Sequence, residues 1–246
     1  MTRHAALVLT LLAAPASLLA QASSWPTHHQ QALWLTTSFE QELDERTSLW
    51  FDGSWRRMGF GAEPQQLLLR PGVIRTIAPG VRVGAGYTYV ANQPYGELPA
   101  ANPSREHRLW QDIRLAQTLG KVSVTHRYRW EQRWLAPLVA GDLGEFEYQQ
   151  RARYMVRAQA PLGERKRHGR PLTWYLQEEL LMPVGHNGAA GRLTQNRFLA
   201  GVGIPLGARD RLDVGYQNLW NAVPSAPGNE VNHVITFNWV VIRPSR

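Results

Sequence analysis

Long segments in which apolar and polar side chains alternate restrict the fold of this chain more than any other feature. Within residues 121–133, one face carries Val124 and Tyr128, and the other carries Arg127 and Arg129. A period of two is typical of a β-strand with two different faces, whereas a helix repeats about every 3.6 residues. Because such segments follow one another along the chain, we predict an all-β protein.

The same alternation predicts eleven strands. Each spans ten or more residues, whereas strands of globular proteins usually have about 5–6 residues and tilted membrane-spanning strands need about 9–11. A soluble sandwich also alternates, but the aromatic residues toward the strand ends of the apolar face and the arginine runs on the polar face favour a membrane barrel. The predicted strands cover residues 32–41, 47–57, 65–76, 81–90, 106–117, 121–133, 147–160, 172–182, 193–203, 210–220 and 232–242.

The links between these strands alternate between short and long, as in outer-membrane barrels with short periplasmic turns and longer external loops. The link 161–171 occupies a short-turn position although it is long. In this arrangement the first and last strands run in the same direction. Because bacterial barrels have an even number of strands, we predict a single antiparallel up-and-down β-barrel of 10–12 long strands. Twelve is preferred, with residues 23–31 supplying the extra strand, and ten is the alternative.

The N-terminal segment 1–22 is predicted to be a signal peptide. It has a basic start, an apolar stretch and the small-x-small sequence Ala20-Gln21-Ala22, so cleavage is expected before Ser23. The apolar stretch is shorter than the roughly 20 residues of a membrane anchor. We therefore expect an exported protein in which residues 23–246 form one barrel domain in the outer membrane, with the periplasm as the alternative location.

Arginine dominates the charge of the chain. Of the 27 basic residues only Lys121 and Lys166 are lysines, against 19 acidic residues, and the net charge is +8. Guanidinium groups pair with carboxylates through two parallel hydrogen bonds, and an unpaired buried charge is costly. We therefore expect an enclosed ion-pair ladder inside the barrel, while Val122, Val124 and Tyr128 contact lipid. The ladder is predicted to contain Glu106, Arg108, Asp112, Arg114, Arg127, Arg129, Glu131, Arg133, Arg151, Arg153, Glu179 and Arg197.

These residues allow several functions. The first interpretation is an outer-membrane barrel whose charged interior has a structural or interaction role. The alternative is a narrow anion-preferring channel for small acidic solutes or oligosaccharides, because arginine exceeds carboxylate in the ladder. A second alternative is a lipid-modifying enzyme, since His186-Asn187-Gly188 lies in a long loop. No serine in a nucleophile-like setting accompanies this histidine, so no enzymatic activity is expected.

The chain has no cysteine, which excludes disulfides, thiol nucleophiles and iron–sulfur clusters. The eight histidines are scattered along the sequence, and we expect neither a metal site nor a cofactor. The expected partners are outer-membrane lipids and small anionic solutes. The basic tract Arg165-Lys166-Arg167-His168 is interpreted as a solvated turn or a contact to anionic headgroups, so no nucleic acid is expected. The sequence does not specify an oligomeric state.

Charged motifs also occur in a characteristic order. They are Glu106-His107-Arg108-Leu109-Trp110-Gln111, Arg127-Tyr128-Arg129-Trp130-Glu131-Gln132-Arg133, Arg151-Ala152-Arg153-Tyr154, Glu178-Glu179, Gln195-Asn196-Arg197-Phe198, Gly215-Tyr216 and a terminal strand with His233. In order and spacing, over roughly residues 30–242, the chain resembles the family called domain of unknown function 2490 (DUF2490). The resemblance implies a secreted, outer-membrane-type barrel of Gram-negative bacteria and brings no assigned activity.

Overall fold

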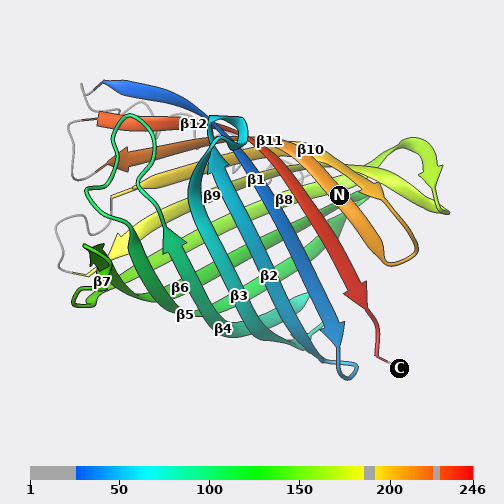
Figure 1. Ribbon diagram of the computed structural model, residues 1–246. Coiled ribbons are helices and arrows are strands. Elements are labelled where there is room, and N and C mark those ends of the chain that lie inside the picture. The colour runs from blue at the N-terminus through cyan, green and yellow to red at the C-terminus, as the bar shows by residue number, and fades with distance from the viewer. Residues whose placement is uncertain (1–25, 186–191, 224–227, 246) are drawn as a thin grey trace.

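The computed structural model describes residues 26–185, 192–223 and 228–245 (Figure 1). Within these ranges the chain is all-β apart from the short 3-10 turn η2 (Gly59–Gly61), which confirms the predicted class. The predicted signal segment 1–22 lies outside the described residues. The strands are β1 (Thr27–Glu42), β2 (Thr47–Met58), β3 (Glu63–Ala78), β4 (Val81–Asn92), β5 (Ser104–Leu119), β6 (Val122–Val139), β7 (Asp142–Leu143), β8 (Glu147–Arg167), β9 (Arg170–Val184), β10 (Gln195–Pro205), β11 (Asp210–Val223) and β12 (Gly228–Arg243).

Each predicted strand coincides with a strand of the structure, but the predicted closure is wrong. All neighbouring strands pair antiparallel except β1 and β12, which pair in parallel from Thr27↔Asn229 to Gln41↔Arg243. In Figure 1, β1 (blue) and β12 (red) lie side by side and point the same way. With β7 left outside, the described residues form a closed barrel of eleven strands, which is neither the preferred twelve nor the alternative ten.

The number of strands dictates this parallel pair. Every hairpin reverses the direction of the chain, so an odd number of strands brings the first and last into the same direction. Residues 27–31, assigned above to an extra strand, instead form the beginning of β1. The short strand β7 pairs only with the end of β6, through Leu138↔Leu143 and Val139↔Asp142, and it does not extend the barrel wall.

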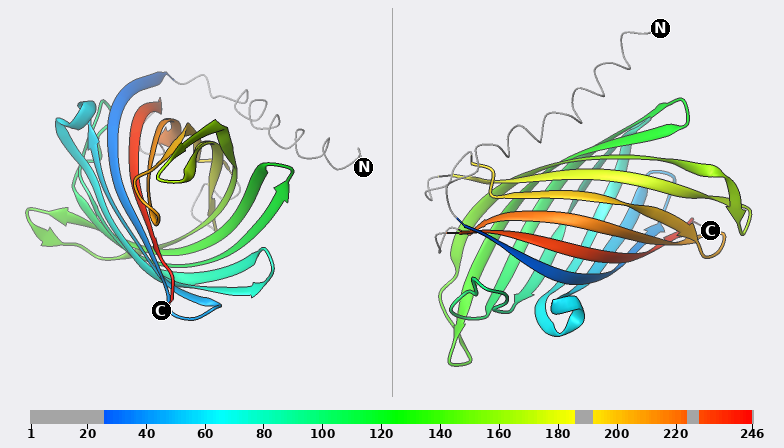
Figure 2. Two further views of the ribbon diagram at one scale, coloured as in Figure 1. Left: turned by 90° about the vertical axis from the view of Figure 1, so that its right-hand side faces the viewer. Right: turned by 90° about the horizontal axis from the view of Figure 1, so that it is seen from above.

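The long link 161–171 is mostly strand. β8 continues to Arg167 and β9 begins at Arg170, so only His168 and Gly169 form the turn, with φ of 52° and 74°. Two-residue hairpin turns commonly require such left-handed conformations, which glycine adopts without steric cost. The end of this hairpin (yellow-green) projects beyond its neighbours in Figures 1 and 2. The link therefore keeps the pattern of short turns at this end of the barrel.

The barrel wall separates a polar interior from an apolar exterior. On β5, Glu106 and Asp112 are buried, whereas the alternate positions Leu109 and Ile113 are exposed. On β6, Val124 is only 2% exposed, so surrounding side chains cover it and its predicted exposure on the outer face is wrong. No helix in the described ranges is long and apolar enough to cross a membrane.

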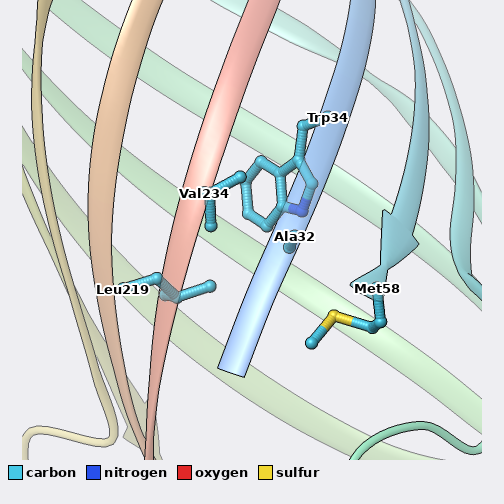
Figure 3. Packing of buried hydrophobic residues seen from close by; sticks show 5 residues of the cluster. All are labelled: Ala32, Trp34, Met58, Leu219 and Val234. Atoms are coloured by element: carbon cyan, nitrogen blue, oxygen red, sulfur yellow. The ribbon is translucent and has the colours of Figure 1, made fainter. Parts of the chain in front are cut away.

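A small apolar cluster lies inside the barrel at the end with the longer links. Strands β1, β2, β11 and β12 supply the cluster, and Tyr95 of the β4–β5 loop packs against it. Figure 3 shows the indole of Trp34 between the side chains of β12 and those of β1 and β2. The cluster consists of Ala32, Trp34, Met58, Leu219 and Val234. It packs the two closing strands, β1 and β12, against β2 and β11, and its Trp34 and Leu219 also line the cavity described below.

Candidate functional site

Arg153 of β8 links two carboxylates in the barrel interior. Its Nη1 donates a hydrogen bond to Glu131 Oε1 at 2.7 Å, and its Nη2 donates to Glu179 Oε1 at 2.6 Å. Glu131 lies on β6 and Glu179 on β9, so this one guanidinium connects three neighbouring strands. All three side chains are almost completely buried. Charge-assisted hydrogen bonds of this kind are stronger than neutral ones.

The twelve residues predicted for the ladder all take part in interior ion pairs, which form three groups: one around Glu106, one around Asp112, and a larger one around Glu131 and Glu179. Glu106 accepts from Arg108 and Arg133, and Asp112 accepts from Arg114 and Arg129. Some pairs join residues two apart on one strand, whereas others cross between strands. The remaining salt bridges are Arg151–Glu131, Arg127–Glu179 and Arg197–Glu179. This set contains eight arginines and four carboxylates, so cations exceed anions within it.

Other interior ion pairs were not predicted from the sequence. Asp52 of β2 accepts from Arg70 Nε at 2.9 Å, and Asp213 of β11 accepts from Arg211 Nε at 2.6 Å and from Arg157 Nη2 at 3.1 Å. These residues lie on the buried faces of their strands. The alternation of the predicted strands 47–57 and 210–220 was the signal that could have identified both aspartates.

Several guanidinium groups of the described interior lie over aromatic rings, and three of them stack closely. The Cζ atoms of Arg129 and Arg157 lie 4.1 Å and 4.0 Å from the ring centroids of Trp110 and Tyr175. Arg56 Cζ lies 3.7 Å from the centroid of Trp34. Cations over aromatic faces are attracted by the ring quadrupole.

Arg56 differs from the other two stacked arginines in its hydrogen bonds. Arg129 and Arg157 also make salt bridges with carboxylates. Arg56 instead donates to the neutral oxygens of Ser54, at 3.3 Å, and Gln66, at 2.9 Å.

A cavity of about 130 Å³ lies beside these groups, and its walls include Trp34, Arg56 and Arg197. Tyr95, from the loop between β4 and β5, lines one side, and its hydroxyl donates to Glu230 Oε2 at 3.3 Å. Burial and the nearby Glu230 carboxylate raise the pKa of the Tyr95 phenol to about 12, so this hydroxyl stays protonated at neutral pH. The sequence did not single out Trp34, Arg56 or Tyr95.

No three His, Asp or Glu side chains within residues 26–185, 192–223 and 228–245 form a cluster suited to a metal ion. The loop residues His186-Asn187-Gly188, considered above for lipid chemistry, lie outside the described part of the chain. The basic tract of residues 165–168 lies at the exposed end of the β8–β9 hairpin.

A closed barrel with a buried ion-pair network and an apolar outer face defines a class of β-barrel protein with a filled, charged interior. The family model described as "Protein of unknown function (DUF2490)" matches residues 31–230. The chain therefore belongs to this family, which confirms the resemblance seen in its motifs. Neither the curated proteins nor the solved structures contain a match to this chain.

Proposed function

We propose that this protein is an exported outer-membrane β-barrel in which the charged interior has a structural or interaction role. The apolar outer face carries this proposal, because soluble monomers rarely expose contiguous apolar patches above a few hundred Å². Lipid would cover such a surface. Exposed large apolar side chains on the strands include Leu35, Leu49, Phe51, Trp55, Leu67, Leu69, Val73, Leu109, Ile113, Leu115, Tyr128, Trp130, Leu176, Phe198, Tyr216 and Trp239.

The filled interior favours a structural role over an open pore. Barrels of about 8 strands have room only for side chains, whereas barrels of about 16–18 strands leave an aqueous channel. In this intermediate barrel the long side chains of Arg153, Arg108 and Arg129 are buried and tied to carboxylates. Opening a path through them requires breaking several charge-assisted hydrogen bonds together.

The excess of arginine over carboxylate supports a second candidate, a narrow anion-preferring channel. A positive lumen attracts small acidic solutes and repels cations. The cavity beside Arg56 supplies space at one end of such a path. A lipid-modifying enzyme has no comparable support among the described residues, and we propose no enzymatic activity.

Membrane fractionation tests the main proposal. The protein is expected in the outer-membrane fraction, resistant to carbonate extraction, with a gel mobility that changes on heating. Recovery as a soluble periplasmic monomer would overturn the proposal.

Planar-bilayer recordings separate the two candidate functions. The structural role predicts no steady current from the reconstituted barrel, whereas the channel predicts a steady current with anion preference. A matched pair of variants sharpens the comparison: Arg153→Gln loosens the central bridge, and Arg243→Gln alters only a half-exposed salt bridge to Asp210. A current that appears only in Arg153→Gln indicates that the interior ion pairs block the lumen of the wild-type barrel.

A further inference from the structure

Arg56 is a buried cation that lacks a carboxylate partner. It is 6% exposed, and its guanidinium stacks on Trp34. Arg129 and Arg157 stack in the same way, but each also makes a salt bridge. No carboxylate of the described residues lies within salt-bridge distance of Arg56, whose nitrogens donate only to neutral oxygens. The nearby carboxylate of Asp52 acts on Arg56 through its charge but is itself paired with Arg70. Arg56 therefore has a stacking partner but no salt bridge, and an unpaired buried charge is costly.

A second guanidinium lies near the same indole ring. Arg197 Cζ is 5.6 Å from the Trp34 ring centroid, and its buried Nε has no hydrogen-bond partner. Its salt bridge to Glu179 is 3.3 Å long, and Glu179 also accepts from Arg127 and Arg153. One carboxylate is therefore shared among three cations. The Nε–H of Arg197 is therefore an unused donor beside the indole of Trp34, on which Arg56 stacks.

The cavity between these groups is positively charged. Seven of its lining side chains are arginines, and Glu106, its one lining carboxylate, is already held by Arg108 and Arg133. Its volume of about 130 Å³ exceeds that of a single water molecule, whose share of liquid volume is about 30 Å³. A bound anion would neutralise Arg56, which makes no salt bridge, and would supply an acceptor beside the unpartnered Nε of Arg197.

We propose that this cavity binds a small oxyanion, the carboxylate or phosphate group of a free solute, between Arg56 and Arg197. The planar guanidinium fork matches the geometry of both groups. Tyr95 of the β4–β5 loop lines one side of the cavity, which favours a compact free solute over a lipid headgroup. The proposal depends neither on membrane insertion nor on conduction, so its test is independent of the proposed function.

Calorimetric titration of the full chain in detergent tests the site, with inorganic phosphate and acetate as separate probes against a chloride background of equal ionic strength. We expect saturable binding of at least one probe, and which probe binds identifies the chemical group. Arg56→Gln should weaken binding about 10- to 100-fold, because it removes a charge-assisted contact. Arg157→Gln is the matched control: it also removes an arginine stacked on a ring, but one that does not line the cavity.

Thermal unfolding separates a binding role from a structural one. In anion-free buffer Arg56→Gln should melt at the same temperature as the wild type or higher, because it removes an unpaired buried charge. The anion that binds should raise the melting temperature of the wild type but not of this variant. Arg56→Lys keeps the positive charge but loses the planar guanidinium fork, so it should bind the anion more weakly than the wild type. This variant replaces Arg56→Gln in the test if Arg56→Gln does not fold. Absence of binding to either probe, or equal binding by wild type and both Arg56 variants, would overturn the proposal.

Discussion

The ring of Trp110 occupies the space that a side chain on Gly72 would need. A Cβ built on Gly72 would stand 2.5 Å from Trp110 Cζ2 and 2.9 Å from the carbonyl oxygen of Ala85. Gly84 and Gly86, on the neighbouring strand β4, approach the same ring. Glycines on two adjacent strands therefore form the surface on which this interior tryptophan packs, with Arg129 stacked on the ring.

Replacing Gly72 by alanine should destabilise the barrel. The new methyl group meets backbone as well as the indole, and overpacking of this kind costs about 1–3 kcal/mol. Denaturant unfolding of the refolded protein measures the change. Gly53→Ala is the control, since its Cβ would meet two exposed side chains and no backbone: the ring of Phe51 at 3.3 Å and Leu69 Cδ2 at 3.9 Å. Equal stability of both variants would contradict the proposed packing.

Arg153→Gln should cause a larger loss. The substitution removes the link between Glu131 and Glu179, and breaking a buried ion pair from one side costs about 3–5 kcal/mol. Arg243→Gln removes a half-exposed salt bridge of 3.4 Å and should change the free energy of unfolding by about 1 kcal/mol or less. Similar losses of unfolding free energy in the two variants would show that the buried salt bridges of Arg153 stabilise the barrel no more than an exposed one does.

Cysteine labelling tests which face meets lipid, and the native chain has no cysteine to interfere. Tyr128→Cys should react with a lipid-soluble maleimide, because Tyr128 is 50% exposed on the apolar face. Arg129→Cys and the nearly isosteric Ser54→Cys lie on the buried face and should react only with small water-soluble reagents, if at all. Reaction of Ser54→Cys from lipid would reverse the assignment of the two faces.

The parallel closure predicts where the ends of the barrel lie in a membrane. β1 and β12 run in the same direction, so the start of β1 and the end of β12 should face opposite sides. Epitope tags placed before Thr27 and after Arg243 can be probed with protease in intact and permeabilised cells. One tag should be cleaved in intact cells and the other only after permeabilisation. Cleavage of both tags from one side would exclude the parallel pair.

Asp44 in the turn after β1 gives a pH-dependent prediction. Its carboxylate accepts from the backbone N–H groups of Arg46 and Thr47, both at 2.8 Å, and the bond from Arg46 lowers the pKa of Asp44 below its ordinary value of 3.8. This stabilisation is present above about pH 4 and is lost as the pH falls through the folded pKa. Asp44→Ala should therefore lower the melting temperature slightly at pH 7. The melting temperatures of wild type and variant should converge in strong acid, where the Asp44 carboxyl is protonated. A difference that persists there would show that the turn does not depend on the ionised carboxylate.

The positions of the strands could be predicted because alternation is a local property. Segment 121–133 places Arg127, Arg129 and Glu131 on one face whatever its partners are, and these side chains are indeed directed into the barrel. The hairpin of β8 and β9 was harder to recognise. Its ends pair beyond an irregularity between Pro161 and Lys166, which interrupts the alternation and makes a strand resemble a loop.

The closure of the barrel could not be predicted from local pattern. The even number of strands was a rule taken from other barrels, and the equal directions of the first and last strands already contradicted it. Which strands meet at the seam depends on the register of the whole sheet, and only the assembled structure shows β1 beside β12.

Side-chain parity follows from each strand alone, so the amino-acid pattern was sufficient to predict the all-β class, the strand segments and the members of the charged face. Which of these charges pair with one another is visible only in the folded barrel. Arg153 makes salt bridges with two carboxylates because β8 lies between β6 and β9. Arg56 instead stacks on the ring of Trp34 and makes no salt bridge. Pairing depends on register and closure between distant segments, so the candidate anion site appears only when the barrel is complete.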